Sequence, residues 1–124
     1  MSIKVYGSPD KLCKQSEIAH MVTFFNFLRT DYPEIAKIAV HIRNEGLRSH
    51  GQAVKYKTEG MIKGACDIII PGDPALCVEM KSKRPGAKVS KEQMEYLEAA
   101  QAAGAFACIA IGVDGAIDAL KDWL

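Results

Sequence analysis

The chain lacks the long apolar runs of a membrane protein and carries almost no net charge. Its hydrophobic stretches are interrupted by charged residues before the roughly 18 to 20 residues that a membrane-spanning helix needs. Residues 1–10 show no basic start followed by an apolar block. The formal net charge is only +1, so any attraction for a polyanion must be local. These absences predict a cytoplasmic protein with no membrane partner.

Cysteine is sparse and has no metal-binding spacing. The four cysteines, at positions 13, 66, 77 and 108, are far apart, and no C-x-x-C pair occurs. Three of them fall inside apolar segments that we expect to be strands. The pattern favours buried free thiols over zinc ligands or disulfides.

The remaining composition suits one globular domain. The 124 residues are 48% hydrophobic and 25% charged, which is typical of a soluble domain with a single core. No linker, repeat or low-complexity tract divides the chain. We therefore expect residues 1–124 to form a single domain.

Apolar spacing predicts helices and strands in mixed order. A helical period runs from Ile18 to Leu28, after a Ser8-Pro9-Asp10 start signal and before a break at Pro33. Further helices are predicted within 47–59, 91–103 and 116–124, and strands at 38–42, 66–70, 76–81 and 105–111. Residues 71–74 are too few for a parallel crossover, so the strands on either side should form an antiparallel hairpin. The predicted fold class is α/β, with a mixed sheet flanked by helices.

Two acids and a lysine interrupt this hairpin. Glu79 and Lys81 lie two apart on a strand and share a face, while Asp67 begins the partner strand. Two close carboxylates repel each other unless a cation lies between them, and their oxygens suit Mg²⁺ or Mn²⁺. Such an ion could polarise a phosphoryl oxygen, with Lys81 orienting water or stabilising negative charge. The simpler alternative is a solvated ion pair beside an ordinary strand-start residue.

Two predicted helices add further candidates. Glu17 lies at the edge of the apolar stripe of the first helix, where it could complete the metal site or pair with His20 at i,i+3. Gln93 and Tyr96 share a face near a helix N-terminus, which attracts anions. The Ser90 capping box also accounts for Gln93, and packing accounts for Tyr96.

A basic run could hold a phosphate backbone. It comprises Lys81, Lys83, Arg84, Lys88 and Lys91, with no acidic residue before Glu92. The run leaves the proposed site and leads to a helix N-terminus, although most such runs are only solvated surface. Arg43 and Arg48 flank Asn44-Glu45-Gly46 and could add contacts.

The ordered motifs resemble those of the VRR-NUC domain, a branch of the PD-(D/E)xK nuclease superfamily with a restriction-endonuclease-like core. They are G-x-x-x-G-x-x-D at 60–67, then Glu79-Met80-Lys81, then Gln93-x-x-Tyr96. The resemblance extends from Glu17 to the last helix. Cys66 stands where the superfamily pattern has proline, which does no chemistry.

By this resemblance, particular roles are expected for the matched residues. Asp67, Glu79 and the backbone carbonyl of Met80 would bind Mg²⁺ or Mn²⁺, and Glu17 would be a further acid beside them. Lys81 would be the catalytic lysine, and Gln93 the helix residue facing the site. The basic residues and Tyr96 would then contact DNA.

The chain resembles the stand-alone family members of phages and bacteria, which implies the host cytoplasm if a phage encodes it. The resemblance implies a homodimeric, structure-specific DNA endonuclease, with four-way junctions as a candidate substrate. Two symmetric cuts need two sites related by a two-fold axis. Phe24, Phe25 and Phe27 exceed one apolar stripe and could form the interface or complete the core. The alternatives are a flap or single-strand nuclease, a non-catalytic nucleic-acid-binding module and a small-molecule phosphohydrolase.

Overall fold

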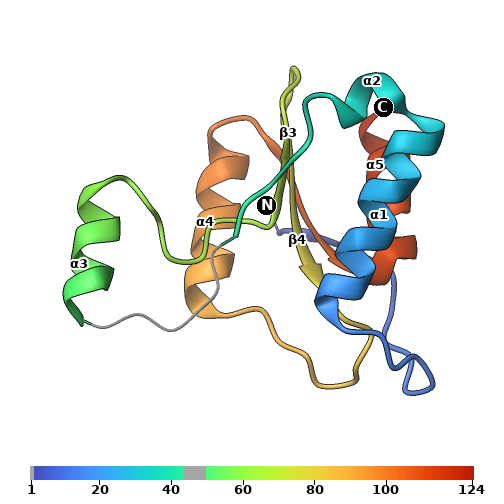
Figure 1. Cartoon of the computed structure of the whole chain (residues 1–124), viewed down its shortest axis with the longest axis horizontal. Helices are drawn as coiled ribbons and strands as arrows, with labels where there is room; N and C mark the ends of the chain where they lie inside the picture. The colour runs from blue at the N-terminus through green and yellow to red at the C-terminus, as the bar shows by residue number, and fades with distance from the viewer. Residues whose placement is uncertain (1, 44–49) are drawn as a thin grey trace.

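A computed structural model describes residues 2–43 and 50–124. The elements in chain order are β1 (Lys4–Tyr6), α1 (Glu17–Asp31), α2 (Pro33–Ala36), β2 (Val40–His41), α3 (His50–Thr58), β3 (Ile68–Ile70), β4 (Leu76–Lys81), α4 (Lys91–Ala102), β5 (Phe106–Ile111) and α5 (Gly112–Trp123). Figure 1 shows them around one sheet. Arg48 and the Asn44-Glu45-Gly46 turn lie outside the described residues.

The five strands form one mixed sheet in the order β1-β5-β4-β3-β2. β4 pairs with β5 in parallel and with β3 antiparallel, which confirms the predicted hairpin. β1 adds a second parallel pair beside β5, and β2 forms the opposite edge. The mixed α/β class predicted from the sequence is therefore confirmed.

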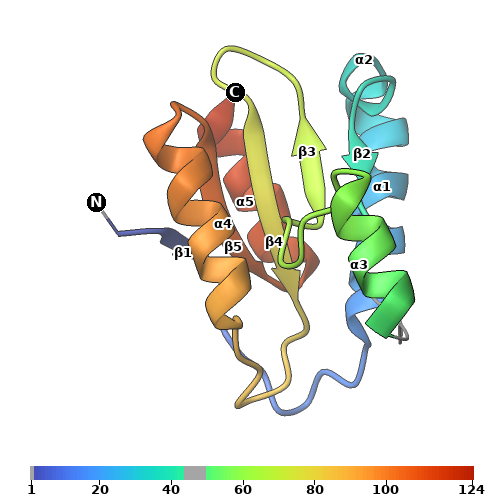
Figure 2. The ribbon, with the colours of Figure 1, turned by 90° about the vertical axis from the view of Figure 1, so that its left-hand side faces the viewer.

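Helices cover both faces of the sheet unequally. In Figure 1, α1, α2 and α5 lie on one side of the strands and α4 lies on the other. In Figure 1, α3 lies on the same side as α4 and farther from the strands, and Figure 2 shows it in front of β2 and α1, with β4 visible between it and α4. None of the described helices has the length and apolarity needed to cross a bilayer.

Each face of the sheet has its own apolar core. The larger core joins α1 and α5 to the sheet and includes Phe24, Val78 and Met80, all fully buried. The smaller core, under α4, includes Leu97, Cys66 and Cys77. Because side chains alternate along β4, Val78 and Met80 face one side of the sheet, whereas Cys77, Glu79 and Lys81 face the other. Three cysteines are buried free thiols and Cys13 is half-buried, as the sequence predicts.

The structure corrects several local predictions. α1 begins at Glu17, where the Ser16 hydroxyl accepts a hydrogen bond from Ala19 N at 3.1 Å, so the earlier Ser8-Pro9-Asp10 is not the start signal. The two-residue edge strand β2 leaves Ile38 and Val40 exposed, although their alternation predicted the buried face. Ala39 packs against the larger core and His41 lies near Phe25, while Ile42, the third residue of the alternation, is half-buried.

The aromatic residues of α1 complete the core of one chain. Phe24 is fully buried, and Phe25 and Phe27 pack partly buried against the same cluster. Phe25 meets Phe24 edge to face with ring centroids 5.9 Å apart, and Phe27 meets Tyr32 at 5.7 Å. Of the two roles considered for these phenylalanines, the structure supports core packing.

Candidate functional site

The β3–β4 hairpin brings Asp67 and Glu79 together. Ile68 pairs with Val78, so the residues one step further, Asp67 and Glu79, lie opposite each other at the end of β3. Asp67 Oδ2 accepts a hydrogen bond of 2.8 Å from Met80 N, replacing the strand partner that β3 no longer provides. Glu79 is only 1% exposed. The short hairpin thus fixes two carboxyl groups on a rigid platform.

Burial and mutual repulsion perturb both acids. Burial is the main cause that raises the pKa of Glu79 to about 9, and the Asp67 carboxylate raises it further while Lys81 opposes the change. Burial also raises the pKa of Asp67, against the hydrogen bond from Met80 N. Within the described part of the chain, Glu79 Oε1 is the buried side-chain atom left without a hydrogen-bond partner. An orphaned carboxylate oxygen beside a second carboxyl group is the arrangement that a cation would satisfy.

Lys81 lies beside this acidic pair. Its Nζ is 3.8 Å from Glu79 Oε2 and donates a hydrogen bond of 3.1 Å to Gln93 Oε1. Gln93 Oε1 also accepts from Ser90 N at 2.8 Å, which closes the capping box of α4. The two roles considered for Gln93 are therefore compatible: one oxygen caps the helix and fixes the lysine.

A glycine allows α4 to approach the site closely. Gly64 has φ +89°, and a Cβ on it would lie 2.6 Å from the Glu92 carbonyl carbon and 2.8 Å from Gln93 N. Only glycine combines that backbone conformation with such contact. The loop that leads to Asp67 is thereby packed onto the first turn of α4. Gly60 also has a positive φ but faces open space.

Asp67, Glu79 and Gln93 line an open cleft of about 320 Å³, together with Glu17 from the start of α1. Partial burial raises the pKa of Glu17, Lys81 lowers it, and Asp67 raises it. The Glu17 carboxyl group therefore interacts electrostatically with both Lys81 and Asp67. His20, its other proposed partner, is buried instead, where Nδ1 accepts from Val113 N at 3.1 Å.

The cleft contains two side chains that sequence reasoning missed. His41 on β2 and Lys63 before Gly64 both line it. The charge of His41 lowers the pKa of Asp67. His41 pairs with Ile68, directly after Asp67, but no local motif marks the β2–β3 pairing. The sequence therefore indicated only that His41 belongs to a strand, not that it lies beside Asp67.

The predicted basic residues are divided by the fold. Lys83 Nζ is 2.9 Å from Asp114 Oδ2 and 3.4 Å from Ser8 O, so it ties α5 to the N-terminal loop and does not join the cleft. Arg84, Lys88 and Lys91 are exposed on and after the β4–α4 loop. Tyr96 packs half-buried against the core under α4. Arg43 is exposed just after β2, away from this loop in sequence.

The residues present fit a divalent cation. In an extended strand the N–H and C=O of one residue point to the same side, so the Met80 carbonyl lies on the same edge of β4 as the N–H that contacts Asp67. Two carboxyl groups and a carbonyl form an oxygen-rich set of the kind that Mg²⁺ and Mn²⁺ prefer. No group of three His, Cys, Asp or Glu side chains is placed to hold an ion within residues 2–43 and 50–124. Water and substrate oxygens would have to complete the coordination.

Comparison with solved structures identifies the fold class as an α/β fold of the VRR-NUC type. One solved chain, described as "VRR_NUC domain protein", superposes with a TM-score of 0.73 over 90% of each chain. The sequence identity is 19%, so the likeness shows a shared fold. It confirms the architecture expected from the motifs. No family model and no curated protein matches the chain.

Proposed function

We propose that the chain is a metal-dependent nuclease that hydrolyses phosphodiester bonds in DNA. The observation that carries the proposal is the meeting of Asp67 and buried Glu79, with Lys81 Nζ 3.8 Å from Glu79 and one Glu79 oxygen unsatisfied. A surface that only bound DNA would gain nothing from clustered acids facing a polyanion. The shared fold with a VRR-NUC domain protein supports the same conclusion.

Asp67, Glu79 and the Met80 carbonyl would hold Mg²⁺ or Mn²⁺, with Glu17 as a further acid at the mouth of the cleft. The bound ion would supply Lewis-acid polarisation of the phosphoryl oxygen and a bound water of lowered pKa. The protein must keep Glu79 deprotonated for this role. The Lys81 ammonium assists, because its charge lowers the pKa of Glu79.

Lys81 is positioned to act on the charge that develops during hydrolysis. Its hydrogen bond to Gln93 and its contact with Glu79 hold the ammonium in one place, so little reorganisation is needed as negative charge appears. We assign it the stabilisation of that charge or the orientation of the attacking water. Gln93 acts through Lys81 and is a positioning residue.

A DNA-cleavage assay tests this proposal. The wild-type chain is incubated with duplex, flap, bubble and four-way-junction DNA, with Mg²⁺, with Mn²⁺ or with EDTA. We expect metal-dependent cleavage that Asp67→Asn abolishes and Asp118→Asn, an exposed acid on α5, leaves intact. Retained cleavage in a folded Asp67→Asn variant, or no cleavage of any substrate by the wild type, would refute the proposal.

The finer proposal is that the substrate is branched DNA and the active species is a homodimer. Its support is the family resemblance and a set of apolar side chains that the core leaves exposed on α1 and around the edge strand: Ile18, Val22, Ile38 and Val40. The α1 phenylalanines no longer support it.

Sedimentation at micromolar concentration, free and with a four-way junction, tests the assembly. We expect a dimer, and Val22→Glu should shift it toward monomer by placing a charge in the interface. A chain that stays monomeric with and without the junction would leave a single-cut nuclease, such as a flap or single-strand enzyme, as the better interpretation.

A further inference from the structure

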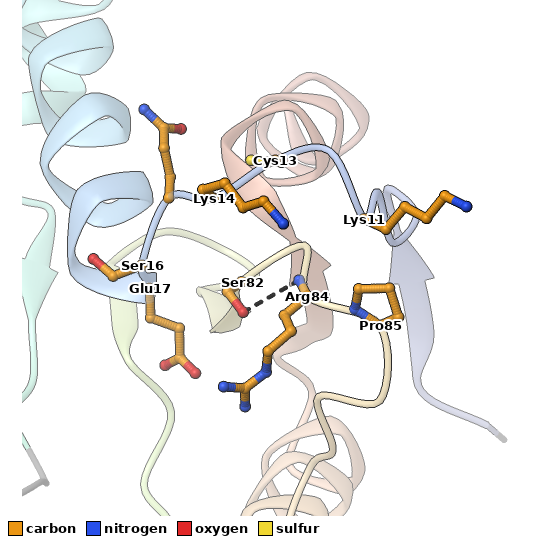
Figure 3. A pocket seen from close by; sticks show the side chains of 9 residues that line it. Lys11, Cys13, Lys14, Ser16, Glu17, Ser82, Arg84 and Pro85 are labelled. Atoms are coloured by element: carbon orange, nitrogen blue, oxygen red, sulfur yellow. Dashed lines mark hydrogen bonds between the residues drawn. The ribbon is translucent and has the colours of Figure 1, made fainter.

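A second groove lies beside the proposed catalytic cleft. It has a volume of about 500 Å³ and runs between the loop before α1 and the loop after β4. Figure 3 shows the side chains around it. Three of its lining residues, Lys11, Lys14 and Arg84, are exposed cations, whereas Glu17 is its acidic residue. The remaining lining includes Ser16 and Ser82, whose hydroxyl groups accept hydrogen bonds from Ala19 N and Arg84 N.

The lysine-bearing wall is held in place by several bonds. Asp10 N donates to Lys83 O at 2.8 Å, which joins the N-terminal loop to the β4–α4 loop. Asp10 also accepts from Leu12 N at 2.9 Å and from Cys13 N at 3.0 Å, and these bonds form the turn that carries Lys11. Lys83 Nζ reinforces the junction through Ser8 O. The wall is therefore ordered before any ligand binds.

The groove adjoins the proposed catalytic cleft at Glu17. This residue lines both cavities. The charges of Lys81, beside Glu79, and Arg84, in the groove, both lower its pKa. A chain of phosphates leaving the Asp67–Glu79 pair could pass Glu17 and meet three cations within the groove. Lysine and arginine side chains attract phosphates without reading bases.

We propose that this groove binds the sugar-phosphate backbone of the cleaved DNA strand, next to the phosphate that is cut. Lys11, Lys14 and Arg84 contact the phosphates, and the proposal rests on the nuclease function proposed above. Lys83 is a positioning residue here, since it anchors the wall that carries Lys11 and Lys14. Binding along the groove is independent of base sequence and weakens with salt.

Lysine footprinting of the intact chain tests the groove directly. An amine-reactive acetylating reagent is applied with and without a saturating DNA oligonucleotide, in Ca²⁺ so that the substrate is not consumed, and each lysine is quantified by mass spectrometry. We expect several-fold slower modification of Lys11 and Lys14. Lys37, which follows α2, and Lys121, in the last turn of α5, serve as internal controls and should not change. Unchanged Lys11 and Lys14 with bound DNA, or protection of the control lysines to the same degree, would overturn the proposal.

A matched pair of variants separates this proposal from the nuclease assignment. Lys11→Gln with Lys14→Gln should lower the slope of log affinity against log salt by about 2, one for each lost phosphate contact. Lys37→Gln with Lys121→Gln should leave it unchanged. If both double variants keep the wild-type slope of log affinity against log salt and still cleave DNA, the groove proposal is refuted and the nuclease proposal stands. A footprint on Lys11 and Lys14 without any metal-dependent cleavage would refute the nuclease and leave a DNA-binding groove.

Discussion

Replacing Glu79 with glutamine should stabilise the metal-free protein, increasingly so as the pH rises. The ordinary pKa of this group is 4.5, and burial beside Asp67 raises it to about 9 in the folded chain. The folded state therefore holds a proton that the unfolded chain releases above pH 4.5. Stability from this group is fully present below about pH 4.5 and is lost as the pH rises toward about 9. Glutamine has no such proton to lose.

The size of the effect follows from the same pKa. Each pH unit in this window is worth about 1.4 kcal/mol, so the loss between pH 4.5 and 7 is at most about 3 kcal/mol. We expect Glu79→Gln to gain about 1 to 3 kcal/mol over wild type across that interval in EDTA. Urea unfolding at pH 5, 7 and 8.5 measures it, with Glu98→Gln, an exposed acid on α4, as the control. A stability difference that does not change with pH would refute the reasoning.

Three further predictions concern neighbouring groups. Lys81→Ala should lose most single-turnover cleavage yet bind DNA, because its role is with the reacting charge; near-normal rates would contradict that role. Gly64→Ala should lower the free energy of unfolding in urea by about 2 to 4 kcal/mol and lower activity, because the new Cβ would collide with α4. Gly60→Ala should cost less, since a Cβ there meets no other atom. Equal losses of stability in the two variants would show that the contact with α4 is unimportant. Changing Arg84, Lys88 and Lys91 together to alanine should flatten the salt dependence of DNA binding, and an unchanged slope would place the DNA elsewhere.

The centre of the site could be predicted because its determinants are local. The loop between β3 and β4 is too short for anything but a hairpin, and hairpin register sets Asp67 opposite Glu79. The i,i+2 spacing then brings Lys81 to the same face. The capping box of Ser90 and Gln93 likewise predicts the start of α4 from four consecutive residues.

Other features depend on contacts between distant segments. β1 has only three residues and pairs with β5 near the opposite end of the chain, so no local period indicated it. The contact of Lys83 with Asp114 removes one residue from an apparently uniform basic run. Lys11 and Lys14 form no motif, and only the folded N-terminal loop brings them to the groove beside Arg84. Charge runs in a sequence show which cations are near each other in the chain, but not which face they share.

Titration calorimetry with Mn²⁺ tests the central claim that Asp67 and Glu79 together hold a divalent cation. The wild-type chain should bind the ion with proton release, because Glu79 must lose its proton to become a ligand. Asp67→Asn and Glu79→Gln should each bind much more weakly, while Asp118→Asn binds as the wild type does. Mn²⁺ binding that is unchanged in both site variants, with the fold intact, would contradict the account.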